Sequence, residues 1–364
     1  MIAFLCATPY QVFNAVNIRR TLFPKEPADL YLLTYTSDLS GLESPLKASQ
    51  LFQNVYLVRT FDGPTSSLKL ARQLCFLQKD LARILYSKVY RVLFGTCVGS
   101  INTVFYSQLR RNNPDLEFDY YDEGIGVYSI PIFQESEKLR RFVRGIGGRD
   151  YYHSIRHLYV YQPQAMVENR QFPLRRIPPV PQTDAPVYNS IFGYEGEGAF
   201  YKSRTVLYLD QAFEKQLGLA MPNGELLSQL TAYFPKERMA VRLHPTRPQE
   251  DPIYGSSGIC CAPRSSLPWE VLLLNLDLSQ RVFVSVHSTA CLTPKLVFDQ
   301  EPTVILLYKL VEPLFEKLPP VLRPNEAFFQ RVKGLYRDPQ KFLIPTSFQE
   351  LKGYLSEKWM GEKG

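Results

Sequence analysis

Two neighbouring carboxylates stand at the end of an apolar run, where an acid–base group could be held in place. Asp122 and Glu123 follow the run LEFDYY, and Gly124 after them permits a sharp turn. Neighbouring residues of an extended chain point to opposite sides, so only one of the two carboxylates can face a cleft. That carboxylate can act as the general base for a hydroxyl group. An acidic turn with solvated side chains is the alternative that the pattern leaves open.

A basic side chain and an imidazole mark the end of a second apolar run, in Arg242-Leu243-His244-Pro245. Because a proline cannot continue a β ladder, Pro245 places His244 where the chain leaves the sheet. A histidine at that position can bind an anionic phosphate or protonate a leaving phosphate. A hydrogen-bonded structural histidine is the alternative.

Two further segments stand at the start of helical patterns. Ser288 and Thr289 are placed to cap a helix, where a phosphate gains amide donors and the favourable end of the helix dipole. Glu270 begins the pattern WEVLLL, where a carboxylate can accept hydrogen bonds from both ribose hydroxyls of a nucleotide. Plain helix capping explains both segments without a ligand. We expect His287, at the end of its apolar run, to be structural.

The elements that must position these residues alternate between short apolar runs and helical patterns. Unbroken runs rich in β-branched and aromatic residues, separated by helices, are typical of a parallel sheet covered on both faces. The predicted strands start at Ile2, Ala28, Asn54, Arg91, Leu116, Thr205, Met239, Gly258, Arg281 and Thr303. Helical spacing covers 10–23, 66–86, 224–233 and 268–275, and the tail from Asn325 onward is also helical in pattern.

A cluster of prolines between Gln162 and Pro186 divides the two series of strands. Proline removes amide donors and restricts the residue before it, so we expect no packed helix or sheet there. With a length of 364 residues, this predicts an α/β fold of two Rossmann-like domains facing a cleft. We place the first domain at residues 1–165, the linker at 166–190, and the second domain with its helical tail at 191–364.

Composition excludes several classes of protein. The 42 basic and 35 acidic residues give a net charge of +7, which without a lysine-rich tail or zinc pattern indicates an anionic ligand and no nucleic acid. The six cysteines have no repeated spacing, which indicates buried thiols in a reducing compartment. The start MIAFLCATPYQ is typical of a first strand rather than a signal peptide. No apolar run approaches the roughly 20 residues that span a bilayer, so we expect a cytoplasmic protein.

The order of these segments is similar to that of bacterial sialyltransferases. Four segments resemble, in chain order, their acidic-acidic-glycine motif, their His-Pro motif, the glutamate that holds the ribose of CMP, and their Ser-Ser/Thr motif: Asp122-Glu123-Gly124, His244-Pro245, Glu270 and Ser288-Thr289. The start ATPYQVFNA and the overall length look most similar to glycosyltransferase family 52. Members of that family include sialyltransferases that decorate lipooligosaccharide and capsule.

The resemblance implies a GT-B fold and an inverting, metal-independent single displacement, with CMP-sialic acid as the donor substrate and no cofactor. Asp122, or Glu123 if the strand register differs, would deprotonate a hydroxyl of a galactose-terminated acceptor on the first domain. Asp210, also at a strand end, is the alternative base, and His244 would donate to the departing phosphate. The donor-binding residues implied on the second domain are Arg242, Pro245, Glu270, Ser288 and Thr289.

Several alternatives stay open. Another CMP-sugar such as Kdo, or another nucleotide sugar, would use the same nucleotide contacts, and a non-catalytic polysaccharide-assembly protein could have kept the fold. The basic segment Glu137–Arg156 can meet acceptor phosphates or anionic headgroups on the inner face of the cell membrane, or it can be a solvated helix face. A lipid-linked acceptor and a homodimer are both compatible with the sequence.

Overall fold

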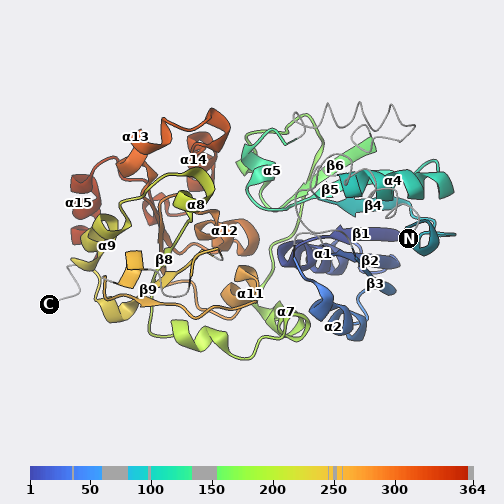
Figure 1. The fold of residues 1–364 in the computed structure, drawn as a ribbon, viewed down its shortest axis with the longest axis horizontal. Coiled ribbons are helices and arrows are strands. Elements are labelled where there is room, and N and C mark those ends of the chain that lie inside the picture. The colour runs from blue at the N-terminus through green and yellow to red at the C-terminus, as the bar shows by residue number, and fades with distance from the viewer. Residues whose placement is uncertain are drawn as a thin grey trace. The chain divides into compact units, whose positions relative to one another are not determined.

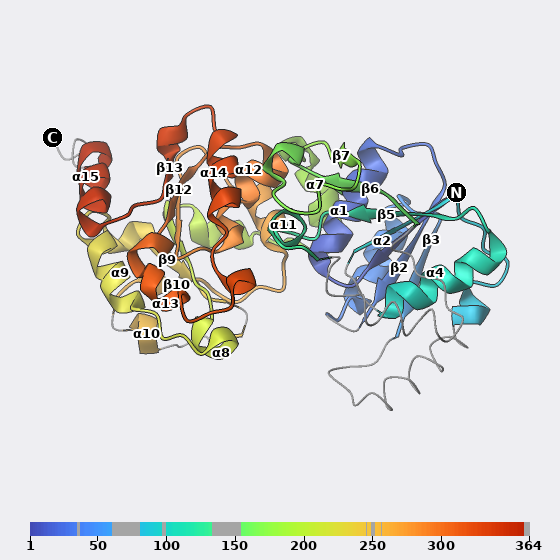
Figure 2. The same cartoon turned by 90° about the horizontal axis from the view of Figure 1, so that it is seen from above.

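The computed structural model describes residues 1–34, 37–59, 81–96, 100–132, 154–244, 246–248, 252–255 and 257–359. The chain divides into two compact units. The first unit contains Met1–Val180 with Pro186–Gly193, and the second contains Pro181–Ala185 with Tyr194–Gly364. Each unit is a parallel sheet with helices packed around it (Figure 1 and Figure 2).

The first unit is built on a seven-stranded parallel sheet of order β3-β2-β1-β4-β5-β6-β7. Its strands are β1 (Ile2–Cys6), β2 (Ala28–Leu33), β3 (Asn54–Val58), β4 (Val92–Gly95), β5 (Glu117–Tyr121), β6 (Ile155–Val160) and β7 (Leu174–Arg176). Its helices include α1 (Pro9–Thr21), α2 (Glu43–Ala48), α4 (Ser100–Asn112), α5 (Gly126–Ser129) and α7 (Ala185–Phe192). The strand order reverses between β1 and β4, so right-handed crossovers put α1 and α4 on opposite faces of the sheet.

Helix α1 begins where local chemistry requires it. Thr8 is extended and its hydroxyl accepts the Gln11 amide at 3.2 Å, while Pro9 occupies the first turn, where no intrahelical donor is needed. The helix buries three polar side chains, Gln11, Asn14 and Asn17, each three residues from the next. This spacing gives α1 a polar stripe that faces the interior of the unit, and this stripe helps to hold Asp122 in position.

The second unit has a six-stranded parallel sheet of order β10-β9-β8-β11-β12-β13. Its strands are β8 (Val206–Leu209), β9 (Met239–Arg242), β10 (Cys260–Cys261), β11 (Val282–Ser285), β12 (Thr303–Leu306) and β13 (Phe342–Leu343). Its helices are α8 (Phe213–Leu217), α9 (Asn223–Thr231), α10 (Pro252–Gly255), α11 (Trp269–Leu274), α12 (Thr293–Phe298), α13 (Glu312–Phe315), α14 (Glu326–Gly334) and α15 (Phe348–Trp359), within the part of the chain described.

Each strand predicted from an apolar run is present within a few residues of its predicted start, and the α/β fold class is confirmed. The expectation of no sheet in the proline-rich stretch was wrong, because β7 lies within it and pairs with β6. The three residues of β7 form an edge strand, so prolines on either side of it remove no ladder hydrogen bond. Most of the helix predicted over 66–86 lies outside the described residues.

The expectations about cysteines and about membrane-spanning segments can be compared with the part of the chain that the structure describes. Cys6 and Cys291 are buried free thiols, whereas Cys260 is exposed and Cys261 partly exposed. The expectation of buried thiols was therefore wrong for the last two, because they lie on the edge strand β10. The remaining two cysteines lie outside the described ranges. No helix in the described part of the chain is both long and apolar enough to cross a membrane.

Candidate functional site

The predicted donor-side residues of the second unit lie at the carboxyl ends of neighbouring strands. The strand order reverses between β8 and β11, and ligands of open parallel sheets bind outside the strand ends at such a reversal. Asp210 follows β8, His244 follows β9, and Ser288 follows β11. The fold therefore gathers at one sheet edge residues that are far apart in the chain.

Trp269, the first residue of α11, connects two of these strand ends. The Arg242 guanidinium lies over the Trp269 ring, 4.7 Å from its centroid, and the Trp269 indole N–H donates to the Ala290 carbonyl at 2.9 Å. A guanidinium at this distance from an indole face is held by cation–π attraction. The segment at Arg242, the start of α11 with Glu270, and the loop at Ser288 are thus one connected group.

The loop that carries Ser288 is fixed by a hydrogen bond to β8 and by hydrogen bonds within the loop itself. The Ser285 hydroxyl donates to the Leu209 carbonyl at 2.7 Å and accepts the Ser288 amide at 3.1 Å. The Ser288 hydroxyl accepts the Ala290 amide at 3.4 Å, so Ser288 caps the short 3₁₀ helix Thr289–Cys291. The cap predicted from sequence is present, and the side chains of Ser288 and Thr289 stay partly exposed.

His244 is held in a defined orientation. Its backbone amide donates to Asp210 Oδ2 at 3.1 Å, and its Nδ1 accepts the Thr246 amide at 3.3 Å. Because Nδ1 accepts a hydrogen bond, the neutral ring carries its proton on Nε2. Burial lowers the pKa of His244 below its ordinary value, which favours this neutral form at pH 7. The imidazole can therefore donate a hydrogen bond from Nε2.

Asp210, the alternative base, is fixed in a buried ion pair. Its Oδ2 accepts Arg247 Nε at 2.6 Å, and Tyr254 donates to Oδ1. The Arg247 guanidinium also pairs with Glu214 Oε2 at 2.6 Å, and Arg247 is only 3% exposed. Loss of this carboxylate's charge would leave the Arg247 guanidinium buried and uncompensated, so the geometry favours Asp210 as an anchor for the His244 loop.

In the first unit Asp122 is buried at the end of β5, with 1% of its surface exposed. Tyr10 and the Gly124 amide donate to its Oδ1 at 3.2 and 2.8 Å, and Tyr128 donates to its Oδ2 at 2.5 Å. The Asn14 side chain donates to the Asp122 backbone carbonyl at 2.8 Å. The polar stripe of α1 therefore fixes the turn that contains the two acidic residues.

The environment of Asp122 changes its acidity. Burial raises the pKa of Asp122 from 3.8 to about 6, and the hydrogen bonds from Tyr128, Gly124 and Tyr10 offset part of this rise. A general base with a pKa near the working pH combines a large ionised fraction with good proton affinity. Asp122 has this property, although its carboxylate lies within the protein.

Glu123 lies beside it with a partly exposed side chain, and Tyr120 donates to its Oε1. The structure therefore separates two properties that the sequence could not: Asp122 has the raised pKa, and Glu123 has access to solvent. Gly124 adopts a φ of 107°, and this backbone conformation explains why glycine ends the motif.

Three of the residues that shape these sites were not predicted from the sequence. Tyr128 and Tyr10 are hydrogen-bonded to Asp122, and Arg247 is paired with Asp210. A buried arginine three positions after a motif histidine gives a weak signal at most. The two tyrosines belong to a chain that contains 23 of them, so no pattern singles them out.

The structure describes some of the remaining predicted residues and not others. Pro245 and residues 137–153 of the basic segment lie outside the described residues. Glu270 is 9% exposed at the start of α11. Within the described ranges, no group of three or more His, Cys, Asp or Glu residues could hold a metal ion.

His287 packs between aromatic rings, with ring centroids 5.2 Å from Phe213 and 5.3 Å from Phe315. Burial lowers the pKa of His287 to about 4, so the ring is neutral. These contacts agree with the structural role expected for His287. They also connect the Ser288 loop to α13, since Phe315 is the last residue of that helix.

Comparison with solved structures identifies the fold. The UDP-GlcNAc 2-epimerase from Neisseria meningitidis bound to UDP-GlcNAc is 9% identical to this chain, with 98% of this chain and 90% of that chain covered and a TM-score of 0.55. The UDP-GlcNAc 2-epimerase from Methanocaldococcus jannaschii is also 9% identical, with 100% and 93% covered and a TM-score of 0.54. At such identities the similarity shows the fold alone.

These similarities, together with the two parallel sheets, confirm the predicted α/β fold of two Rossmann-like domains of the GT-B type. The sequence matches no protein-family model and no curated protein. The resemblance to glycosyltransferase family 52 therefore stays a prediction that rests on the motifs.

Proposed function

We propose that the chain is an inverting glycosyltransferase that moves sialic acid from CMP-sialic acid to a galactose-terminated glycan of lipooligosaccharide or capsule. The observation that carries this proposal is the connection made by Trp269, which contacts Arg242 and Ala290 and so links the segments that contain three of the four motifs. These segments lie at the β8/β11 reversal of strand order, where open parallel sheets bind their ligands, and this position supports a shared binding role.

On the donor side, His244 would donate a hydrogen bond from Nε2 to a phosphate oxygen of the departing CMP. Ser288 and Thr289, on the partly exposed loop after β11, would hold further phosphate oxygens. Glu270 would accept hydrogen bonds from the ribose hydroxyls. Arg242 and Pro245 complete the proposed donor set, in which no metal or cofactor takes part.

On the acceptor side, the proposed base is Asp122, with Glu123 as the second candidate. The raised pKa of Asp122 supports its choice, and the partial exposure of Glu123 supports the other. Deprotonation of the acceptor hydroxyl and stabilisation of the leaving phosphate could each contribute about 10²–10⁴-fold to the rate. Asp210 is retained as the third candidate, although its ion pair with Arg247 argues for a positioning role.

The reaction is tested by incubating the purified protein with CMP-sialic acid and a galactose-terminated acceptor in EDTA. We expect CMP release and a sialylated product of the corresponding mass. Release of CMP without product would indicate the right donor and the wrong acceptor. Neither release nor CMP binding would contradict the sialyltransferase proposal.

The alternatives are separated in the same experiment. CMP-Kdo replaces CMP-sialic acid in one reaction, and UDP-GlcNAc, which is bound in one of the structures of similar fold, replaces it in another. Turnover of CMP-Kdo alone would move the proposal to another CMP-sugar, and turnover of UDP-GlcNAc alone would move it to another nucleotide. Absence of turnover with every donor would favour a non-catalytic polysaccharide-assembly protein. The proposed setting is the cytoplasm, with the lipid-linked acceptor at the inner face of the membrane.

A further inference from the structure

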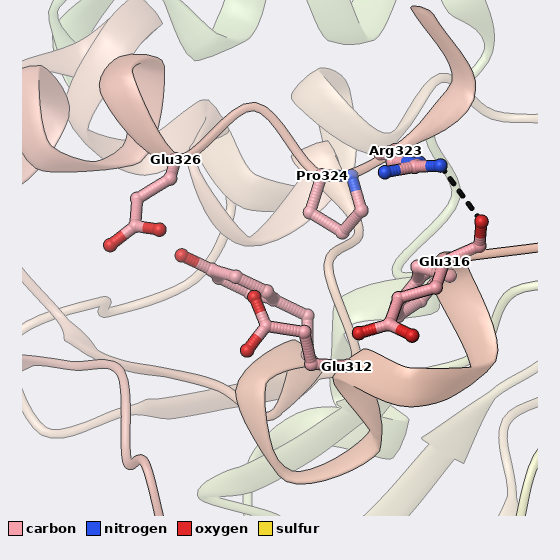
Figure 3. A pocket seen from close by; sticks show the side chains of 7 residues that line it. Glu312, Glu316, Arg323, Pro324 and Glu326 are labelled. Atoms are coloured by element: carbon pink, nitrogen blue, oxygen red, sulfur yellow. Dashed lines mark hydrogen bonds between the residues drawn. The ribbon is translucent and has the colours of Figure 1, made fainter. Parts of the chain in front are cut away.

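The burial of Asp122 raises the question of how a proton reaches its carboxylate. Asp122 is 1% exposed, so a sugar hydroxyl outside the protein has almost no direct access to it. Figure 3 shows the contrasting case in the second unit, where the exposed side chains of Glu312, Glu316 and Glu326 surround a pocket. Carboxylates that are open in this way exchange protons with water directly. If Asp122 is the base, a neighbouring group must carry the proton to it.

Two tyrosine hydroxyls donate to the carboxylate of Asp122, one to each oxygen. Tyr128 donates to Oδ2 at 2.5 Å and is itself 1% exposed, so its hydroxyl is enclosed as well. Tyr10 donates to Oδ1 at 3.2 Å and is partly exposed. Of these two phenols, it is therefore Tyr10 that combines a bond to the carboxylate with exposure to solvent.

The position of Tyr10 is fixed by the segment ATPYQVFNA, to which the proposed reaction gives no role. Thr8 caps α1, so Tyr10 lies in the first turn of that helix. Four residues later, on the same face of α1, the Asn14 side chain donates to the Asp122 backbone carbonyl at 2.8 Å. One helix face thus binds both the carboxylate and the backbone of Asp122, which sets the Tyr10 hydroxyl in place beside the carboxylate.

The hydrogen bond from Tyr10 is the longer of the two. Ordinary O–H···O bonds are about 2.7–2.8 Å long, so the bond from Tyr128 is already closed, whereas the 3.2 Å bond from Tyr10 can still shorten. Catalytic hydrogen bonds are often long in ligand-free structures and tighten when the substrate is bound. A phenol also accepts one hydrogen bond while it donates another, which is what the transfer of a proton requires.

We propose that Tyr10 passes the proton of the acceptor hydroxyl to Asp122 and so enables the buried carboxylate to act as the base. The inference rests on the proposed transfer reaction and adds a catalytic residue to it. The acceptor hydroxyl gives its proton to Tyr10 Oη while Tyr10 gives its own proton to Asp122 Oδ1. The electron pair of the acceptor oxygen forms the bond to the anomeric carbon of the donor sugar. The bond from that carbon to the nucleotide phosphate breaks, and its electron pair leaves with the phosphate oxygen.

The acidity of Asp122 suits both directions of this relay. With its pKa raised to about 6 by burial, the carboxylate is mostly ionised at pH 7 and still has a useful affinity for a proton. After the product departs, the proton returns from Asp122 to water through Tyr10. The relay also separates the two candidate bases, because the partly exposed Glu123 needs no intermediate group.

The test is single-turnover kinetics of the full chain with CMP-sialic acid and a galactose-terminated acceptor, in water and in mixtures with deuterium oxide. Tyr10→Phe keeps the ring and removes the hydroxyl, so it should lower the rate by about 10²-fold and leave CMP affinity unchanged. A plot of the wild-type rate against the deuterium fraction should be curved, because two protons move in one step. The curvature should be lost in Tyr10→Phe, a change that a purely structural tyrosine would not cause.

A double variant tests whether the two residues act in series. If Tyr10 works through Asp122, then adding Tyr10→Phe to Asp122→Asn should slow the reaction no further. A further loss of about 10²-fold would mean that the two residues act independently, and it would overturn the relay.

Two other tyrosines provide controls. Tyr128→Phe removes the second hydroxyl bonded to Asp122, and it should change the rate through the pKa of the carboxyl but keep the curved plot. Tyr86→Phe removes the hydroxyl of an 81% exposed tyrosine in the same unit and should react as the wild type does. Circular dichroism confirms that each variant is folded. The wild-type plot needs no variant, so it tests the relay even if Tyr10→Phe does not fold.

The outcomes distinguish the relay from the reaction on which it rests. An unchanged rate in Tyr10→Phe, or a straight plot for the wild type, would overturn the relay and keep the transfer reaction. Loss of turnover in Glu123→Gln but not in Asp122→Asn would do the same. Turnover of another nucleotide sugar with the same effects of Tyr10→Phe would support the relay and change only the donor. Absence of turnover with every donor would overturn the transfer reaction and the relay with it.

Discussion

Replacing Asp122 by asparagine should remove one source of pH dependence from the stability of the first unit. The carboxyl is 1% exposed, and its pKa in the folded protein is raised from 3.8 to about 6, mainly by burial. A carboxyl whose folded pKa is raised stabilises the fold when it is protonated. This contribution is complete below pH 3.8 and is lost as the pH rises through about 6.

The magnitude follows from the size of the pKa shift. A difference of about two units, at about 1.4 kcal/mol per unit, corresponds to about 3 kcal/mol. Because the loss has already begun at pH 4, the free energy of unfolding of the wild type, taken relative to Asp122→Asn, should fall by about 2 kcal/mol between pH 4 and pH 7. A misplaced amide in the variant would add a constant offset, which leaves this slope unchanged.

The assay must report on the first unit by itself. Both tryptophans, Trp269 and Trp359, belong to the second unit, so their fluorescence does not follow the first. Urea unfolding monitored by pulsed hydrogen exchange of peptides from β5 and α5, analysed by mass spectrometry, gives that signal. Glu123→Gln is the matched control, since it removes the neighbouring, partly exposed carboxylate and should keep the wild-type pH dependence.

A flat difference between the wild type and Asp122→Asn over this range would refute the reasoning. A difference that grows with pH would do so too, because it would mean that the ionised carboxylate is the stabilising form. If Asp122 is also the base, kcat/KM should rise with pH about a midpoint near 6 in the wild type. Asp122→Asn should then lower it by about 10²-fold or more.

Three further predictions concern the second unit. Arg247→Met should cost about 3–5 kcal/mol of stability in urea unfolding, and adding Asp210→Asn should restore most of it; a loss below about 1 kcal/mol would show that the pair is unimportant. His244→Gln, which keeps a donor near the Nε2 position, should retain more turnover than His244→Asn or His244→Ala, with CMP affinity similar in all three; equal turnover in Gln and Ala variants would remove the Nε2 donor from the mechanism. Trp269→Phe should weaken CMP binding in calorimetry by about fivefold, since the indole bond to Ala290 is lost; unchanged affinity would separate Trp269 from the donor site.

The strands of both sheets could be predicted because parallel strands buried on both faces are continuous apolar runs. Residues Ile2–Cys6 and Val282–Ser285 are buried throughout, and apart from Ser285 at the end of β11 their sequences contain no polar position that would mark a face. Strands β6, β7 and β13 were not predicted. The sequence of β6, IRHLYV, places Arg156 and His157 in its first half, so it is not a continuous apolar run. Strands β7 and β13 were missed because they are short. Three and two residues at a sheet edge give no period, and only the neighbouring strand defines them.

The position of His244 could be predicted from local chemistry, and its partners could not. The proline after it marks the end of a strand wherever that strand lies in the fold. Its hydrogen bond to Asp210 joins residues 34 positions apart, and Tyr10 reaches Asp122 across 112 positions. Such pairs depend on strand order, which a run of apolar residues does not report.

Two buried carboxylates follow strands in this molecule, and their surroundings give them different roles. Asp210 meets a guanidinium at 2.6 Å, so its negative charge is already balanced within a buried ion pair. Asp122 meets two phenols and an amide, which donate hydrogen bonds but bring no positive charge. In this environment Asp122 gains a proton near neutral pH at little cost, because the burial penalty on its charge is then relieved. The sequence pattern indicates both Asp122 and Asp210 as candidate bases, and the charge of their partners favours Asp122.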